Sequence, residues 1–216
     1  MENQKITIDK NQILEWYTDD VLREAKPKSV YAFAKKHEVE ESDFYLHFSS
    51  LPSIENYFFE ALFQATVTTL HTSDDYSTYS PKEKLLSFYY TFFENLKMNR
   101  SFVQYALGNQ SLADLKKLKG LRLEFLDFAQ ELEIEKLDLK QKDINKIQDK
   151  VMEESAWLHL LGTLKFWLND DSAHFEKTDV FIEKSVNAGF ELINLNAFKN
   201  VADFGKFMFK EFKPSK

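Results

Sequence analysis

The residues best placed to do chemistry in this chain lie between Lys28 and Ile54, in the segment KSVYAFAKKHEVEESDFYLHFSSLPSI. Lysine, tyrosine and histidine side chains can donate hydrogen bonds to the phosphate oxygens of nucleic acid. Seven such residues occur in the segment, and the candidates for phosphate contact among them are Lys28, Lys35, Lys36, Tyr45 and His47. The pattern around them predicts two short helices joined by a tight turn. That is the layout of a helix-turn-helix module, whose second helix enters the DNA major groove.

Acidic residues stand among these donors and leave two interpretations open. The three lysines of the segment are outnumbered by four acids, Glu38, Glu40, Glu41 and Asp43, although a phosphate-binding surface normally carries positive charge. Glu40 or Glu41 could accept a hydrogen bond from a cytosine amino group. Alternatively, the acids of the second helix only favour its dipole, by a few tenths of a kcal/mol each, and touch no partner.

Composition restricts the class of protein. The 216 residues are 44% hydrophobic and include 21 Phe, enough for a large aromatic core, and only 5 Gly and 4 Pro argue against an all-β fold. Without any Cys, disulfides and thiolate chemistry are excluded. The N-terminus shows no signal-like apolar region and no run is long enough to span a membrane, so we expect a soluble, cytoplasmic protein.

No pattern in the sequence indicates catalysis. The five histidines are scattered without paired metal-ligand spacing, and we find no glycine-rich phosphate loop, nucleophile elbow or inward-facing pair of carboxylates. We therefore predict no catalytic residue, no metal site and no cofactor, and we do not expect an enzyme.

Helical periodicity runs along nearly the whole chain, which predicts an all-α fold. Three short helices, the second capped by Ser29, make up an N-terminal head over residues 1–52, and a body of about six helices covers 53–216. The body begins with a helix from Pro52 to about Leu70 and a polar loop at 71–81. Further helices are expected near 82–98, 100–107, 111–132, 140–169 and 175–197.

The two long helices near 140–169 and 175–197 are candidates for a dimer interface. The first has apolar residues on more than one face, so two of its faces must pack against other elements. One of these elements could belong to a second subunit. Gly162 and Gly189 each lower helix stability by about 1 kcal/mol relative to alanine in a helix interior. A close crossing of two helices would explain why glycine occurs at these positions. We predict a homodimer through a four-helix interface, with a monomer containing one deeply buried helix as the alternative.

The chain resembles the TetR family of one-component transcriptional regulators. The family's turn and recognition helix read Gly-Val-Ser-x-Gly-Thr-x-Tyr-x-His/Tyr-Phe, followed by a Ser-Lys pair. Matching residues stand here at Val39, Tyr45, His47, Phe48 and Ser50, and at Ala34 in the preceding helix. The segment 162–190 is similar to the last two helices of the family's C-terminal domain.

The residues that depart from this pattern are mainly those expected to face DNA. The turn glycine is Glu38, the capping serine is Glu40, and the phosphate-contacting threonine is Asp43. Leu51 replaces the lysine of the Ser-Lys pair, whereas Ser42 is an acceptable small residue beside the DNA backbone. By resemblance, the DNA-binding residues are Lys28, Lys35, Lys36, Glu41, Ser42, Tyr45 and His47.

The resemblance also implies a ligand pocket in the body and a repressor whose two heads respond to that ligand. The candidate pocket residues are Phe88, Phe92, Tyr105, Phe125, Trp157 and His159, which suit a small apolar ligand. These aromatics could instead form plain core, with His159 a core histidine whose hydrogen bonds are satisfied. The alternative function is a TetR-fold protein that no longer reads DNA and binds a lipid or a protein partner, as do lipid-binding proteins of quinone biosynthesis.

The C-terminal tail, AFKNVADFGKFMFKEFKPSK, carries regularly spaced phenylalanines with lysines among them. Such a basic amphipathic helix could lie on a membrane surface, enter a partner's groove, or dock onto its own body or dimer mate.

Overall fold

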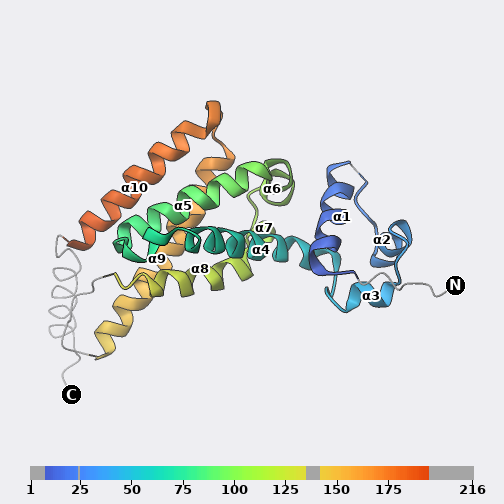
Figure 1. The fold of residues 1–216 in the computed structure, drawn as a ribbon, viewed down its shortest axis with the longest axis horizontal. Coiled ribbons are helices and arrows are strands. Elements are labelled where there is room, and N and C mark those ends of the chain that lie inside the picture. The colour runs from blue at the N-terminus through green and yellow to red at the C-terminus, as the bar shows by residue number, and fades with distance from the viewer. Residues whose placement is uncertain (1–7, 24, 135–141, 195–216) are drawn as a thin grey trace, which may run out of the picture. The chain divides into compact units, whose positions relative to one another are not determined.

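The computed structural model describes residues 8–23, 25–134 and 142–194, and all of their regular elements are helical (Figure 1). The predicted all-α fold is confirmed. In chain order, the elements are α1 (Lys10–Leu22), α2 (Val30–Lys36), α3 (Glu41–Tyr45), α4 (Leu51–His71), the 3₁₀ helix η1 (Asp74–Thr78), α5 (Pro81–Met98), α6 (Arg100–Leu107), α7 (Leu112–Lys116), α8 (Lys119–Glu131), α9 (Lys142–Leu168), the 3₁₀ helix η2 (Ala173–Phe175) and α10 (Glu176–Asn194).

The helix expected at 111–132 is two helices. The amide of Lys117 donates to the carbonyl of Asp114 and that of Leu118 to Leu115, at 3.0 and 3.1 Å. These bonds span three residues rather than four, so the backbone tightens into a turn between α7 and α8.

The first three helices gather into one small cluster at the N-terminal end of Figure 1. Ser29 caps α2 as predicted, because its hydroxyl accepts from the amide of Ala32 at 3.1 Å. The rings of Phe33 and Phe44 meet edge to face with centroids 5.7 Å apart, and both side chains are fully buried. This aromatic pair holds α2 against α3 and fixes the helix-turn-helix geometry.

The turn between α2 and α3 places Glu38 in a left-handed conformation, with φ 56°. The amide of Val39 donates to the carbonyl of Ala34 at 3.0 Å, which is the long hydrogen bond of a Schellman motif. Glycine is the usual residue at this position because it has no Cβ to clash. Glu38 therefore holds a backbone conformation that is strained for a residue with a Cβ, and Glu40 caps α3 without a side-chain hydrogen bond.

The described residues divide into two compact units. The first contains the residues up to Thr68 together with Phe92–Glu124, and the second contains Thr69–Thr91 together with those from Phe125 onward. Because α4, α5 and α8 are continuous helices, each contributes residues to both units. A functional boundary at 52/53 stays a prediction.

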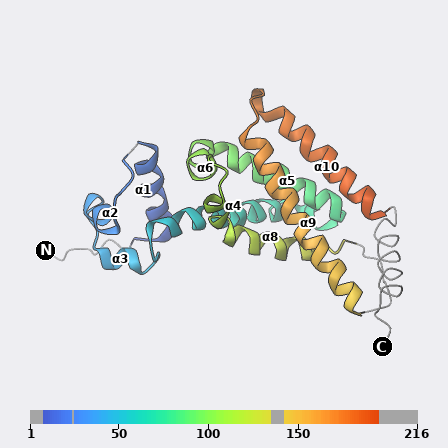
Figure 2. The ribbon, with the colours of Figure 1, turned by 180° about the vertical axis from the view of Figure 1, so that it is seen from behind.

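In the second unit, α9 and α10 run antiparallel on either side of a turn organised by Asp170 (Figure 2). One carboxylate oxygen of Asp170 accepts from the amide and hydroxyl of Ser172, at 2.9 and 2.6 Å. The other accepts from the amide and hydroxyl of Thr178, at 2.9 and 2.7 Å. These bonds to its ionised form lower the pKa of Asp170 to about 2 despite its burial.

No helix within 8–23, 25–134 and 142–194 combines the length and apolar character needed to cross a membrane. The phenylalanine- and lysine-rich tail predicted to be amphipathic lies outside the described residues.

Candidate nucleic-acid interface and ligand cavity

The structure exposes five of the seven residues predicted to meet DNA. Lys28, Lys35, Lys36, Ser42 and Tyr45 are exposed, and Tyr45 retains 53% of its accessible area. Lys35 lies in the last turn of α2, and Ser42 and Tyr45 lie on α3. Side chains of this kind can contact phosphates from a recognition helix and the helix before it.

Lys36 is engaged within the chain. Its ammonium nitrogen lies 2.6 Å from one oxygen of Asp20, and Nε2 of His37 lies 3.0 Å from the other. Asp20 is almost completely buried on α1, and the ring of Trp16 stacks on that of His37 with centroids 4.8 Å apart. Because Asp20 balances its charge, Lys36 adds less positive potential to this surface than the sequence suggests.

Two further predicted contacts also have partners inside the head. Nε2 of His47 donates to the carbonyl of Ile8 at 2.8 Å, which ties the turn after α3 to the segment that precedes α1. The hydroxyl of Tyr45 lies 3.4 Å from Glu41, a long distance for a hydrogen bond. Tyr45 can therefore turn to another acceptor easily, whereas His47 is held.

A buried polar network lies beneath the head, in the first unit. The hydroxyl of Tyr17 donates to Glu55 at 2.7 Å, and the Lys117 ammonium lies 2.9 Å from the other Glu55 oxygen and 3.1 Å from Asp114. Burial and the adjacent Glu55 carboxylate raise the pKa of Tyr17. These residues come from α1, α4 and α7 and the turn after it, so the network joins the head to later helices. Nothing in the sequence spacing predicts it.

A cavity of about 370 Å³ opens in the second unit, within the size range of small-molecule sites. Its walls come from α5, α8, α9 and α10. The apolar lining includes Leu85, Phe125, Met152, Val186, Phe190 and Ile193.

Two of the six predicted ligand residues, Phe125 and His159, line this cavity. Phe88 and Trp157 are buried beside it and contact the ring of Phe125, with centroids 5.4 and 6.4 Å away. Phe92 and Tyr105 belong to the first compact unit. The aromatic residues of the sequence indicated an aromatic-rich region of the body. Helical spacing alone could not show which of the six predicted residues line one cavity.

The cavity has a polar end formed by Tyr89, His159 and Ser185. The Tyr89 oxygen lies 2.5 Å from Nδ1 of His159, and Nε2 of that ring lies 2.7 Å from the Ser185 oxygen. Burial lowers the pKa of His159 and raises that of Tyr89, so both groups are held neutral. The hydrogen-bonded histidine considered from sequence is therefore observed, and it also faces a cavity.

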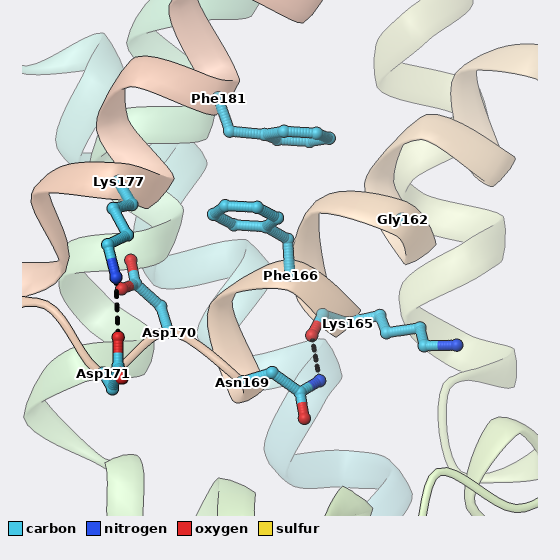
Figure 3. A pocket seen from close by; sticks show the side chains of 8 residues that line it. All are labelled: Gly162, Lys165, Phe166, Asn169, Asp170, Asp171, Lys177 and Phe181. Carbon is cyan, nitrogen blue, oxygen red and sulfur yellow. Dashed lines mark hydrogen bonds and ion pairs between the residues drawn. The ribbon is translucent and has the colours of Figure 1, made fainter.

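The two helix glycines are not crossed closely by another part of the described chain. A Cβ built at Gly162 or Gly189 would have no described atom within 4 Å, and a close crossing with a second subunit stays a prediction. Gly189 lines the cavity. Gly162 lines an open groove of about 500 Å³ along α9 and α10. In this groove the rings of Phe166 and Phe181 stack with centroids 4.6 Å apart (Figure 3).

Residues 84–208 match the family model of the tetracyclin repressor-like C-terminal domain. The match covers more than half of the chain. A search of curated proteins gives no significant match.

Proposed function

The chain belongs to the tetracyclin repressor-like (TetR) family, and from that premise we propose that it is a DNA-binding transcriptional repressor controlled by a small, largely apolar ligand. The observation that carries the proposal is the α2–Glu38–α3 arrangement. It keeps helix-turn-helix geometry through a Schellman turn and a buried aromatic pair, ahead of the matched C-terminal domain.

Exposed donors on the head support DNA binding. Lys28 and Lys35 supply positive charge, and Ser42 and Tyr45 supply hydroxyl groups, all on the surface formed by α2 and α3. In the proposed complex, α3 lies in the major groove while these side chains hold the phosphates on either side. Glu41 accepts a hydrogen bond from a cytosine amino group, and Lys36 and His47 act mainly to position the head.

Exposed apolar residues on α9 and α10 support a homodimer. Leu158 retains 63% of its accessible area, Leu192 57% and Val180 47%. A second copy of the same two helices would cover these side chains in an isologous four-helix interface. Two heads held in this way could reach successive major grooves of one operator.

Ligand binding would control the spacing of the two heads. A ligand that fits the cavity better in one arrangement of the dimer shifts the population toward that arrangement. The continuous helices α4 and α5 connect the cavity-bearing unit covalently to the head-bearing unit. The bound state then no longer fits the operator.

The decisive experiment is a salt-titrated binding assay with DNA fragments that flank the protein's own gene. We expect sequence-selective binding whose logarithm falls steeply with the logarithm of the salt concentration. Lys35→Ala should weaken binding and reduce the salt slope by about one unit, as loss of one phosphate contact requires. The matched control is Lys82→Ala, an exposed lysine of α5. Weak binding without sequence preference would overturn the proposal.

A second function is favoured by the acidity of the head. Lys36 is paired with Asp20, and Glu40, Glu41 and Asp43 surround the start of α3. A head of this charge could serve as a scaffold in a TetR-fold protein that binds a lipid or a protein and does not read DNA. Ligand binding in the absence of any selective DNA binding would support this function.

A further inference from the structure

The second-unit cavity has a polar end whose hydrogen bonds run in one direction. The Ser185 hydroxyl donates to the carbonyl of Phe181 at 2.6 Å, so its oxygen must accept the proton on Nε2 of His159. In the neutral ring, Nδ1 then carries no proton and accepts from the Tyr89 hydroxyl. The Tyr89 proton is committed to His159. A ligand group that reaches the Tyr89 oxygen from the cavity must therefore be a donor.

The charged groups of the cavity lining also favour a ligand that donates hydrogen bonds. Asp149 and Glu153, one helical turn apart on α9, are both cavity residues, and both present acceptor oxygens. Gln130 on α8 donates its amide to Glu153 at 2.9 Å, which leaves its carbonyl as a further acceptor. Among the described lining residues there is no lysine or arginine. The described lining thus presents two carboxylates and no cationic side chain.

Apolar residues make up the rest of the lining. Phe125, Met152 and Phe190 come from three different helices and offer flexible and aromatic surface to a hydrocarbon body. Gly189 leaves room in the α10 wall that any larger side chain would occupy. A ligand suited to this cavity thus has an apolar body and a hydrogen-bond-donating, positively charged end.

We propose that the cavity binds a cationic amphiphile, with its ammonium group between the Glu153 and Asp149 carboxylates and its hydrocarbon body against Phe125 and Met152. The proposal rests on the proposed function, because it names the class of ligand that controls the protein. An anionic amphiphile of the same length, such as a fatty carboxylate, binds more weakly because the two carboxylates of a partly dehydrated wall repel it.

The test is isothermal titration calorimetry of the full-length protein with decylamine and decanoate below their micellar concentrations and with decanol below its solubility limit. At pH 7 the amine is protonated, since its chemistry is that of a lysine side chain. We expect one decylamine per chain and affinity at least about tenfold tighter than for decanoate, with decanol between them. Equal or tighter binding of decanoate, or no binding of decylamine, would overturn the proposal.

Single substitutions test which side chains of the cavity bind the ammonium group. Glu153→Gln and Asp149→Asn should each weaken decylamine binding about tenfold and leave decanol affinity within about twofold, because only the amine uses the charge. Glu183→Gln removes the same charge from an exposed position on α10 and should change neither affinity. Gly189→Leu should abolish binding of both by filling the wall. Unchanged decylamine affinity in both carboxylate variants would overturn the assignment.

The DNA assay separates this proposal from the proposed function. Decylamine binding without operator binding would support the proposed ligand class and overturn the proposed repressor function. Operator binding that is released by decanoate and not by decylamine would retain the repressor and overturn the ligand class.

Discussion

In the first unit, the buried carboxylates of Asp20 and Glu55 lie against lysine ammonium groups, whereas Tyr89, His159 and Ser185 in the second unit satisfy one another without formal charge. Even Asp170, a buried acid of the second unit, is held by hydroxyl and amide donors rather than by a cation. Removing one partner of a buried ion pair lowers the free energy of unfolding more than removing one partner of a neutral hydrogen bond does. The two units should therefore respond differently to single substitutions.

The largest effect is expected for Lys117→Met. This change leaves Glu55 and Asp114 without their shared cation, and Glu55 retains only 4% of its side-chain area. Breaking a buried pair in this way should lower the free energy of unfolding by about 3 kcal/mol in urea denaturation. Lys116→Met is the matched control, because Lys116 is exposed on α7 and should change stability little. Equal effects of the two variants would contradict the importance of the network.

Asp170→Asn should cost about 2 kcal/mol, since the carboxylate accepts four hydrogen bonds and its pKa is lowered to about 2. A carboxyl group with a pKa lower in the folded than in the unfolded chain stabilises the fold above the unfolded value. That stability is lost as the pH falls from about 4 toward 2. The difference in unfolding free energy between wild type and variant should thus shrink over this range. A difference independent of pH would refute the carboxylate's role.

Tyr89→Phe tests the neutral network and should cost about 1–2 kcal/mol, because Nδ1 of buried His159 loses its donor. Tyr90→Phe, at a partly exposed neighbour on α5, provides the control and should be nearly neutral. Nitrogen chemical shifts of His159 should report a proton on Nε2 in the wild type. A proton on Nδ1 would reverse the direction of the hydrogen-bond chain.

Glu38→Gly should have the smallest effect and raise stability by up to about 1 kcal/mol. Glycine relieves the left-handed strain at φ 56°, although it adds freedom to the unfolded chain. Glu38→Gln removes the charge but keeps the Cβ, so it should leave stability unchanged. If both variants strengthen DNA binding equally, the charge of Glu38 is the cause. If only the glycine variant strengthens DNA binding, the backbone conformation at residue 38 is the cause.

Local features were accessible from sequence because they depend on neighbouring residues. Ser29 caps α2 as the local pattern predicted, and Glu38 lies in the left-handed region at the position where the TetR family has glycine. Gly189 lies in the wall of the cavity, and no described atom lies within 4 Å of a Cβ built on it. An interior glycine shows only that a side chain is missing and does not say what fills the space.

The sequence by itself indicated the all-α class, two short helices joined by a tight turn, and a resemblance to the TetR family, since these rest on periodicity, caps and a short motif. Tertiary structure alone decided which polar groups are available. It paired Lys36 with Asp20, 16 residues away, and His159 with Tyr89, 70 residues away. It also assigned Phe125 and His159 to the cavity and Tyr105 to the other unit. Such pairings depend on how separate helices pack, and no local spacing specifies the distance between helices so far apart in the chain.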